Sequence, residues 1–162
     1  GGGNMGWVET SQKENTLTII FYLLAAVFVS AISIIFIPAF RGIVSGTFMI
    51  ISGVIMVILG SVLIGLTLVQ KVEGKHKKYL ILTGASAAGF FVFALLHNIF
   101  YALAQVTSHI SILNYLMKAF EVIFFLIAIF ACPIGFVIGV IGTIVMFKKK
   151  RKILKKIQSN KL

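Results

Sequence analysis

Four long runs without a charged residue most constrain what this chain can fold into. The runs are Asn15–Phe40, Gly42–Gln70, Tyr79–Met117 and Val122–Phe147. The hydrocarbon core of a bilayer is about 30 Å thick, and a helix needs roughly 20 apolar residues to cross it. Each run is long enough, and a soluble fold of 162 residues has no place to bury four such segments. We therefore expect an all-α integral membrane bundle of four transmembrane helices.

The breaks between these runs set the expected boundaries. Pro38 disfavours the helical conformation in the residue before it, so residues 38–42 should form a tight turn. The stretch 105–114 (QVTSHISILN) is the least apolar part of the membrane domain and should form an outer loop or interfacial turn. Short loops make consecutive helices antiparallel neighbours. The expected spans are about 16–37, 43–69, 79–104 and 117–147, preceded by an N-terminal segment 1–15 and followed by a tail 148–162.

Residues 1–4 precede the first methionine, Met5, and have the composition of an added leader or an incomplete start. The fold prediction does not use them.

Positive charge falls almost entirely on alternate connections. Only Arg41 and Lys118 lie between the first and second or the third and fourth runs. Cytoplasmic loops of membrane proteins carry an excess of Lys and Arg, so both termini and the link 71–78 are expected in the cytoplasm of a multi-pass plasma-membrane protein. The net charge of +11 then indicates topology rather than nucleic-acid binding, because the bases lie directly beside apolar spans. Thirteen of the 15 basic residues are on this side: Lys13, Lys71, Lys75, Lys77, Lys78, Lys148, Lys149, Lys150, Arg151, Lys152, Lys155, Lys156 and Lys161.

Small residues at helical spacing predict how the spans pack. Helix association in lipid depends on close contact between backbones, which small side chains permit. Pro133, within the fourth span, removes a backbone hydrogen bond and should kink that helix. The expected packing residues are Gly46, Gly53 and Gly60 on the second span, Gly84 and Ala88 on the third, and Gly135 and Gly139 on the fourth.

One polar cluster within the membrane domain is a candidate site. His97, Tyr101 and Gln105 are spaced i, i+4, i+8 and form one stripe, and Asn98 lies about 100° round the helix from His97. Glu121 begins the fourth span on the same side and could approach the stripe. Polar groups at membrane depth usually face the bundle interior. Interhelical hydrogen bonding and a ligand or ion site both remain open as interpretations.

The residues of this chain give little support for a catalytic site or a metal site. Ser86 and His97 are eleven residues apart on one helix, about 16 Å along its axis, so they cannot form a hydrogen-bonded dyad. Cys132 is the only cysteine, and no set of residues has metal-ligand spacing. We expect no enzyme, no metal and no cofactor.

The tail adds a candidate lipid contact. Residues 148–156 hold seven bases in nine positions. Bases next to a membrane contribute about 1 kcal/mol each near an anionic leaflet. Ile153, Leu154 and Ile157 would share one face if the helix continued. The expected headgroup contacts are Lys148, Lys149, Lys150, Arg151 and Lys152.

The segment Leu82–Ala104 (LTGASAAGFFVFALLHNIFYALA) resembles a stretch of small prokaryotic multi-pass membrane proteins. Their pattern, LLTGASAxGFxVFxxLHNxxYAL, is matched at Thr83–Gly89, Phe93, Leu96–Asn98 and Tyr101. No function is assigned to those proteins, so the resemblance implies a class and no chemistry.

Two functions follow as expectations. The first is a non-enzymatic accessory or membrane-organising protein that acts through helix contacts with a membrane-protein partner or a second copy. The alternative is a small oligomeric channel or transporter with a polar pathway near His97 and the Pro133 kink. A buried, hydrogen-bonded imidazole would favour the first, and a solvated cavity beside His97 would favour the second.

Overall fold

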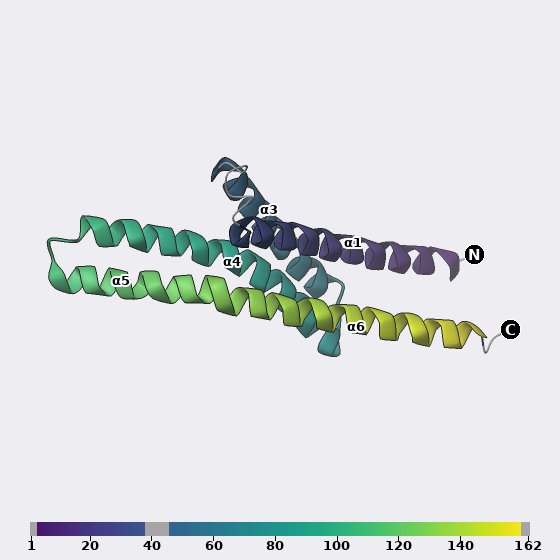
Figure 1. Cartoon of the computed structure of the whole chain (residues 1–162). Helices are drawn as coiled ribbons and strands as arrows, with labels where there is room; N and C mark the ends of the chain where they lie inside the picture. Colours follow the sequence, from purple (N-terminus) through teal and green to yellow (C-terminus); the bar gives the residue numbers. More distant parts are fainter. Residues whose placement is uncertain (1–2, 38–45, 160–162) are drawn as a thin grey trace.

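The computed structural model describes residues 3–37 and 46–159, with side chains described for 15–35, 37, 47–153, 156 and 159 (Figure 1). The described part contains no strand, and its four long apolar helical stretches are each able to cross a membrane and pack against one another. The predicted all-α membrane-type bundle is therefore confirmed. The helices are α1 (Gly3–Phe36), α3 (Gly46–Val69), α4 (Gly74–Val106), α5 (Ser111–Leu126), the π-helical turn η1 (Ile127–Ala131) and α6 (Cys132–Ser159).

The helices extend beyond the expected membrane spans. Helix α1 starts at Gly3, well before the predicted span at 16, and α5 starts at Ser111 rather than near 117. Because α4 continues to Val106, the predicted outer loop 105–114 was too long, and only residues 107–110 connect α4 with α5. Hydropathy indicates where a helix leaves the lipid, not where the helix itself ends. Ser, Thr, Gln and Asn can remain helical where another helix packs against them. The predicted turn 38–42 lies outside the described residues.

Helix α4 is the centre of the bundle. It packs on α3 along one face and on α5, η1 and α6 along another, while α1 packs chiefly on α3. The segment Thr83–Ala88 of α4 contacts both α3 and α6. Residues four apart lie on the same side of a helix, and their neighbours in the sequence lie on other sides. Gly84 and Ala88 therefore meet α3, whereas Thr83 and Ser86 meet α6.

The crossing of α3 and α4 needs glycine on both helices. A Cβ on Gly60 would lie 2.6 Å from the carbonyl oxygen of Gly84, and one on Gly84 would lie 2.7 Å from the carbonyl oxygen of Gly60. A Cβ on Gly53 would overlap the ring of Phe91. Gly65, on the same helix, has nothing within 4 Å of its Cβ position. Gly46 begins α3, and its side-chain surroundings lie outside the described part.

The crossing of α4 and α6 is equally close. A Cβ on Gly139 would lie 2.8 Å from the backbone nitrogen of Thr83, and one on Gly135 would lie 2.6 Å from the hydroxyl oxygen of Ser86. Gly142, one turn further along α6, faces the Tyr79 ring. Such contacts let backbones approach and gain dispersion energy that bulkier side chains would prevent.

Where the sequence analysis predicts a kink at Pro133, the structure has a π-helical turn that ends two residues before the proline. The backbone N–H of Cys132 donates to the carbonyl oxygen of Ile127, five residues back. Proline cannot donate to the carbonyl four residues before it, and its ring crowds that carbonyl. The wider π turn absorbs this mismatch, so that α5, η1 and α6 run on as one rod (Figure 1).

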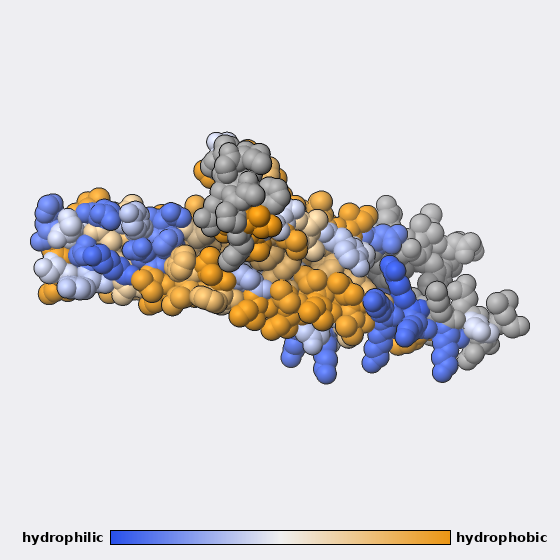
Figure 2. All heavy atoms as spheres, viewed as in Figure 1, coloured by the Kyte–Doolittle hydropathy of each residue, from blue (hydrophilic) through white to orange (hydrophobic). Residues whose placement is uncertain are grey.

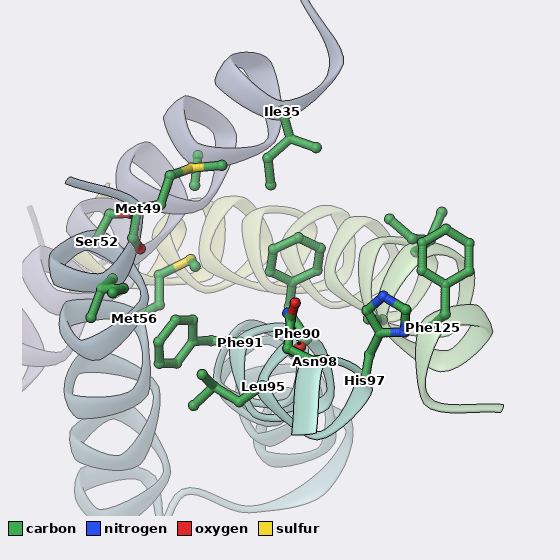
Figure 3. A pocket seen from close by; sticks show the side chains of 15 residues that line it. Ile35, Met49, Ser52, Met56, Phe90, Phe91, Leu95, His97, Asn98 and Phe125 are labelled. Atoms are coloured by element: carbon green, nitrogen blue, oxygen red, sulfur yellow. Dashed lines mark hydrogen bonds between the residues drawn. The ribbon is translucent and has the colours of Figure 1, made fainter. Parts of the chain in front are cut away.

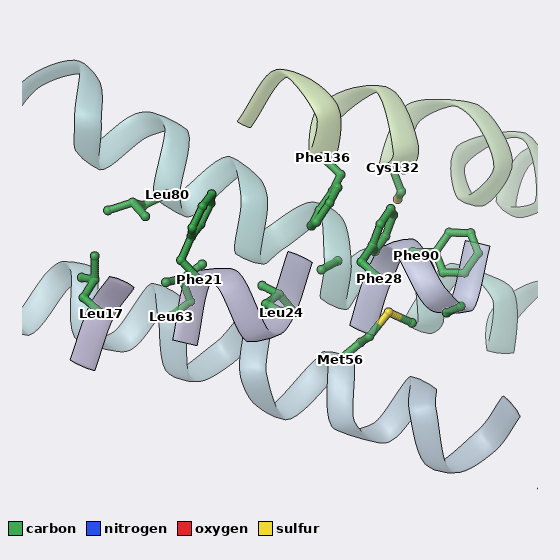
Figure 4. Close-up of a cluster of buried hydrophobic side chains, with 12 residues drawn as sticks. Leu17, Phe21, Leu24, Phe28, Met56, Leu63, Leu80, Phe90, Cys132 and Phe136 are labelled. Atoms are coloured by element: carbon green, nitrogen blue, oxygen red, sulfur yellow. The ribbon is translucent and has the colours of Figure 1, made fainter. Parts of the chain in front are cut away.

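Helix α1 is held by large side chains instead of glycines. Leu17, Phe21, Leu24 and Phe28 recur every three or four residues and are all buried (Figure 4). The Phe28 ring stacks on Phe136 of α6 with centroids 3.8 Å apart, and it meets Phe90 of α4 edge-on. One aromatic cluster thus joins three helices at the middle of the bundle.

The two ends of the bundle differ in charge. The His76 ring lies 4.9 Å from that of Phe147, which lies 5.9 Å from Phe21, so the starts of α4 and of the basic tail share one end. Both termini point to this end (Figure 1), which we call the basic end. The α4–α5 connection forms the opposite, hairpin end. Hydrophilic residues gather at both ends and an apolar band lies between them (Figure 2).

Candidate functional site

His97 makes one of the polar contacts that join α4 to α5. Its Nδ1 lies 3.2 Å from the backbone carbonyl oxygen of Glu121. A carbonyl oxygen can only accept, so Nδ1 is the donor in this contact. The ring is half-buried and lies against Phe125.

The other predicted members of the cluster do not join it. Asn98 is exposed and donates to the Ala94 carbonyl oxygen of its own helix at 2.8 Å. Tyr101 is 51% exposed, and Gln105 is exposed. Glu121 contributes its backbone, and its carboxylate forms no ion pair with Lys118. Of the predicted stripe, Tyr101 and Gln105 are therefore exposed, and only His97 points toward α5.

Asn114 is a contact that the sequence analysis missed. Its side-chain nitrogen donates to the Ala104 carbonyl oxygen, which ties α5 to the end of α4. The pairs His97–Glu121 and Ala104–Asn114 share one antiparallel register. Asn114 lies seven residues before Glu121, two helical turns away on the same face. Placing residues 105–114 in a loop hid this spacing.

A cavity of about 290 Å³ lies beside His97, between the hairpin-end parts of α1 and α3 and the helices α4, α5 and η1 (Figure 3). Ile35, Met49, Met56, Phe90 and Phe125 point into it, along with other apolar side chains. Its polar lining residues are Ser52, His97 and Asn98. The cavity is thus apolar, with a polar edge at its hairpin end.

The hairpin formed by α4 and α5 extends beyond this cavity. At 1.5 Å per residue, Tyr79 to Asn98 measures about 29 Å, which is already the thickness of a bilayer core. Ile35, near the end of α1, and Met49, near the start of α3, line the same cavity and so lie near that level. Helix α4 continues from Asn98 to Val106 for about another 12 Å.

Helix α5 is described throughout and buries none of its residues. Its side away from α4 carries Ile112, Tyr115, Val122 and Ile123, which are 85%, 75%, 53% and 48% exposed. This set, spaced at helical intervals, is called the α5 stripe below. Among the described helices, α5 packs chiefly on α4.

The basic tail is helical as far as Ser159 in continuation of α6, and Ile153 is half-exposed. The side chains of Leu154 and Ile157 lie outside the described set. Lys148, Lys149, Lys150, Arg151 and Lys152 are all exposed. Within the described residues, no three His, Cys, Asp or Glu side chains lie close enough together to hold a metal ion.

The fold therefore defines a class, the all-α protein with four helices suited to cross a membrane. No family model, curated protein or solved structure matches this chain.

Proposed function

We propose that this chain is a non-enzymatic integral membrane protein that binds a second membrane protein through the α5 stripe. The observation that carries the proposal is a helix with no buried residue that exposes four large apolar side chains on the side away from α4. A surface helix of a self-contained fold buries its apolar side against its own chain. The α5 stripe finds no such cover among the described residues.

Lipid can cover only the inner part of this stripe. One bilayer-core thickness, counted along α4 from Tyr79, ends near Asn98, and Glu121 contacts His97 at that level. The part of α5 from Ser111 to Glu121 therefore extends about 15 Å further. Ile112 and Tyr115 then lie past the hydrocarbon, where large exposed apolar surfaces usually mark an interaction site. A partner with a helix that also rises out of the membrane would cover both parts.

The cavity favours this function over a channel. An ion pathway is lined by charged groups, carbonyls or water-holding polar groups. Only three of the fifteen residues that line the cavity, Ser52, His97 and Asn98, are polar. His97 also uses one ring nitrogen to hold α5.

A photocrosslinking amino acid at Ile112 should capture a discrete protein in native membranes. The same group at Ile134, 57% exposed on α6 within the bilayer core, is the matched control and should yield lipid adducts. Mass spectrometry of both products is the measurement. Lipid adducts alone at Ile112 would overturn the proposal, and a product of twice 17.7 kDa would replace the partner by a second copy.

We further propose that the exposed bases that begin the tail contact anionic lipid at the cytoplasmic face. Replacing Lys148, Lys149 and Lys150 by Gln in the full chain should weaken retention of anionic lipid by roughly a hundredfold, from about 1 kcal/mol per base. Lipid counting by native mass spectrometry at two salt concentrations measures this. The wild-type retention should fall with salt because exposed charges are screened. Equal retention by the triple variant would contradict it.

A further inference from the structure

The cavity and the hairpin surface next to it form one continuous amphipathic face. On α4, Ala94 and Asn98 line the cavity, and Tyr101 and Gln105 continue the same side at i+7 and i+11 from Ala94. On α5, Phe125 lines the cavity, and Lys118 lies seven residues before it on the same side. Asn98, Tyr101, Gln105 and Lys118, all exposed, are called the polar ledge below.

We propose that this face binds one phospholipid from the surrounding membrane, with an acyl chain in the cavity and the phosphate on the polar ledge. The inference is independent of the partner proposed for the α5 stripe, which lies on the side of α5 away from α4. Both sites belong to the same hairpin but use different surfaces.

The level of the site matches a lipid. The ledge begins at Asn98, about one bilayer-core thickness from Tyr79, where headgroups lie. The cavity extends from there toward Phe90, eight residues deeper along α4, where acyl chains lie. A water-soluble ligand would have to leave water to enter an apolar cavity, whereas the acyl chain of a lipid is already in an apolar environment.

The chemistry of the two parts also matches. The cavity of about 290 Å³ is just below the roughly 300–1,000 Å³ of small-molecule sites, so it accommodates one chain rather than a whole lipid. Lys118 supplies a positive charge for a phosphate, and Tyr101 and Asn98 supply donors. His97 lines the same cavity, next to Asn98.

Delipidated protein in detergent, titrated with dioleoyl phosphatidylglycerol and followed by native mass spectrometry, tests the inference. With Lys148, Lys149 and Lys150 replaced by Gln to remove the lipid site proposed for the tail, the protein should still retain one lipid more tightly than any further ones. Ala94→Phe fills the cavity and should weaken retention at least tenfold. Ala85→Phe is the matched control, because Ala85 is exposed on α4 and does not line the cavity. Equal retention by both variants would overturn the proposal.

The ledge is tested by headgroup preference, which does not depend on a buried substitution. Lys118→Gln should reduce the preference for phosphatidylglycerol over phosphatidylcholine by roughly fivefold, as expected for one juxtamembrane charge. Lys156→Gln, an exposed base in the tail far from the cavity, is the control and should leave the preference of the tight site unchanged. An unchanged preference in Lys118→Gln would place the phosphate elsewhere and overturn the proposed site, even if Ala94→Phe failed to fold.

Discussion

Gly60→Leu should lower the free energy of unfolding in detergent by about 3 kcal/mol, the upper part of the usual range for overpacking. Its Cβ would lie 2.6 Å from the Gly84 carbonyl oxygen, and a backbone atom cannot move aside as the end of a flexible side chain can. Helices α3 and α4 would have to separate along their whole crossing. Unfolding by increasing SDS in mild detergent, followed by near-ultraviolet circular dichroism, measures the change.

Gly65→Leu is the matched control, because Gly65 is on the same helix with nothing within 4 Å of its Cβ position. Its effect should stay within about 0.5 kcal/mol, as for surface substitutions generally. Gly139→Leu should repeat the large loss at the α4–α6 crossing, where the obstacle is the Thr83 backbone. Similar midpoints for Gly60→Leu and Gly65→Leu would show that the close crossing of α3 and α4 is wrong.

A cysteine at Ser108 should react almost completely with an impermeant maleimide in intact cells, whereas cysteines at Glu73 and Ser159 should not. The expectation rests on the proposed orientation, with the basic end in the cytoplasm. Ser108 is exposed in the α4–α5 connection, and Glu73 and Ser159 are exposed at the basic end. Cys132→Ala removes the native thiol, which is buried. The fraction labelled before and after permeabilising the membrane is the measurement.

Glu73 is preferred to Gly74 for this test because Gly74 has φ +68°, a left-handed conformation that strains other residues. Labelling after permeabilisation confirms that the two basic-end cysteines are accessible. The reverse pattern in intact cells would invert the orientation, and it would place the α5 stripe and the polar ledge on the cytoplasmic side.

The sequence by itself determined the class of fold and the two ends of the bundle. Four apolar runs and the alternation of basic with nearly uncharged connections need no tertiary information, because each reflects transfer of a local segment between water and lipid. The spacing of the small residues likewise identified close contacts between helices: Gly60, Gly84 and Gly139 face a neighbouring backbone, and Gly53 and Gly135 face the side chains of Phe91 and Ser86. Helix ends were less predictable. Residues 105–106 and 111–114 are helical although Gln105, Ser111 and Asn114 are polar, because pairing of α4 with α5 stabilises the hairpin.

Only the tertiary structure decided what the polar residues do. Periodicity places His97, Tyr101 and Gln105 on one stripe, but it cannot say which helix lies opposite. The register of the hairpin turns His97 toward the Glu121 backbone and leaves Tyr101 and Gln105 exposed. The cavity is likewise a product of packing: α1 is held against α3 and the aromatic cluster, and its end leaves space beside α5 and η1. Such a space depends on where separate helices stop relative to one another, and no local pattern in the chain encodes that distance.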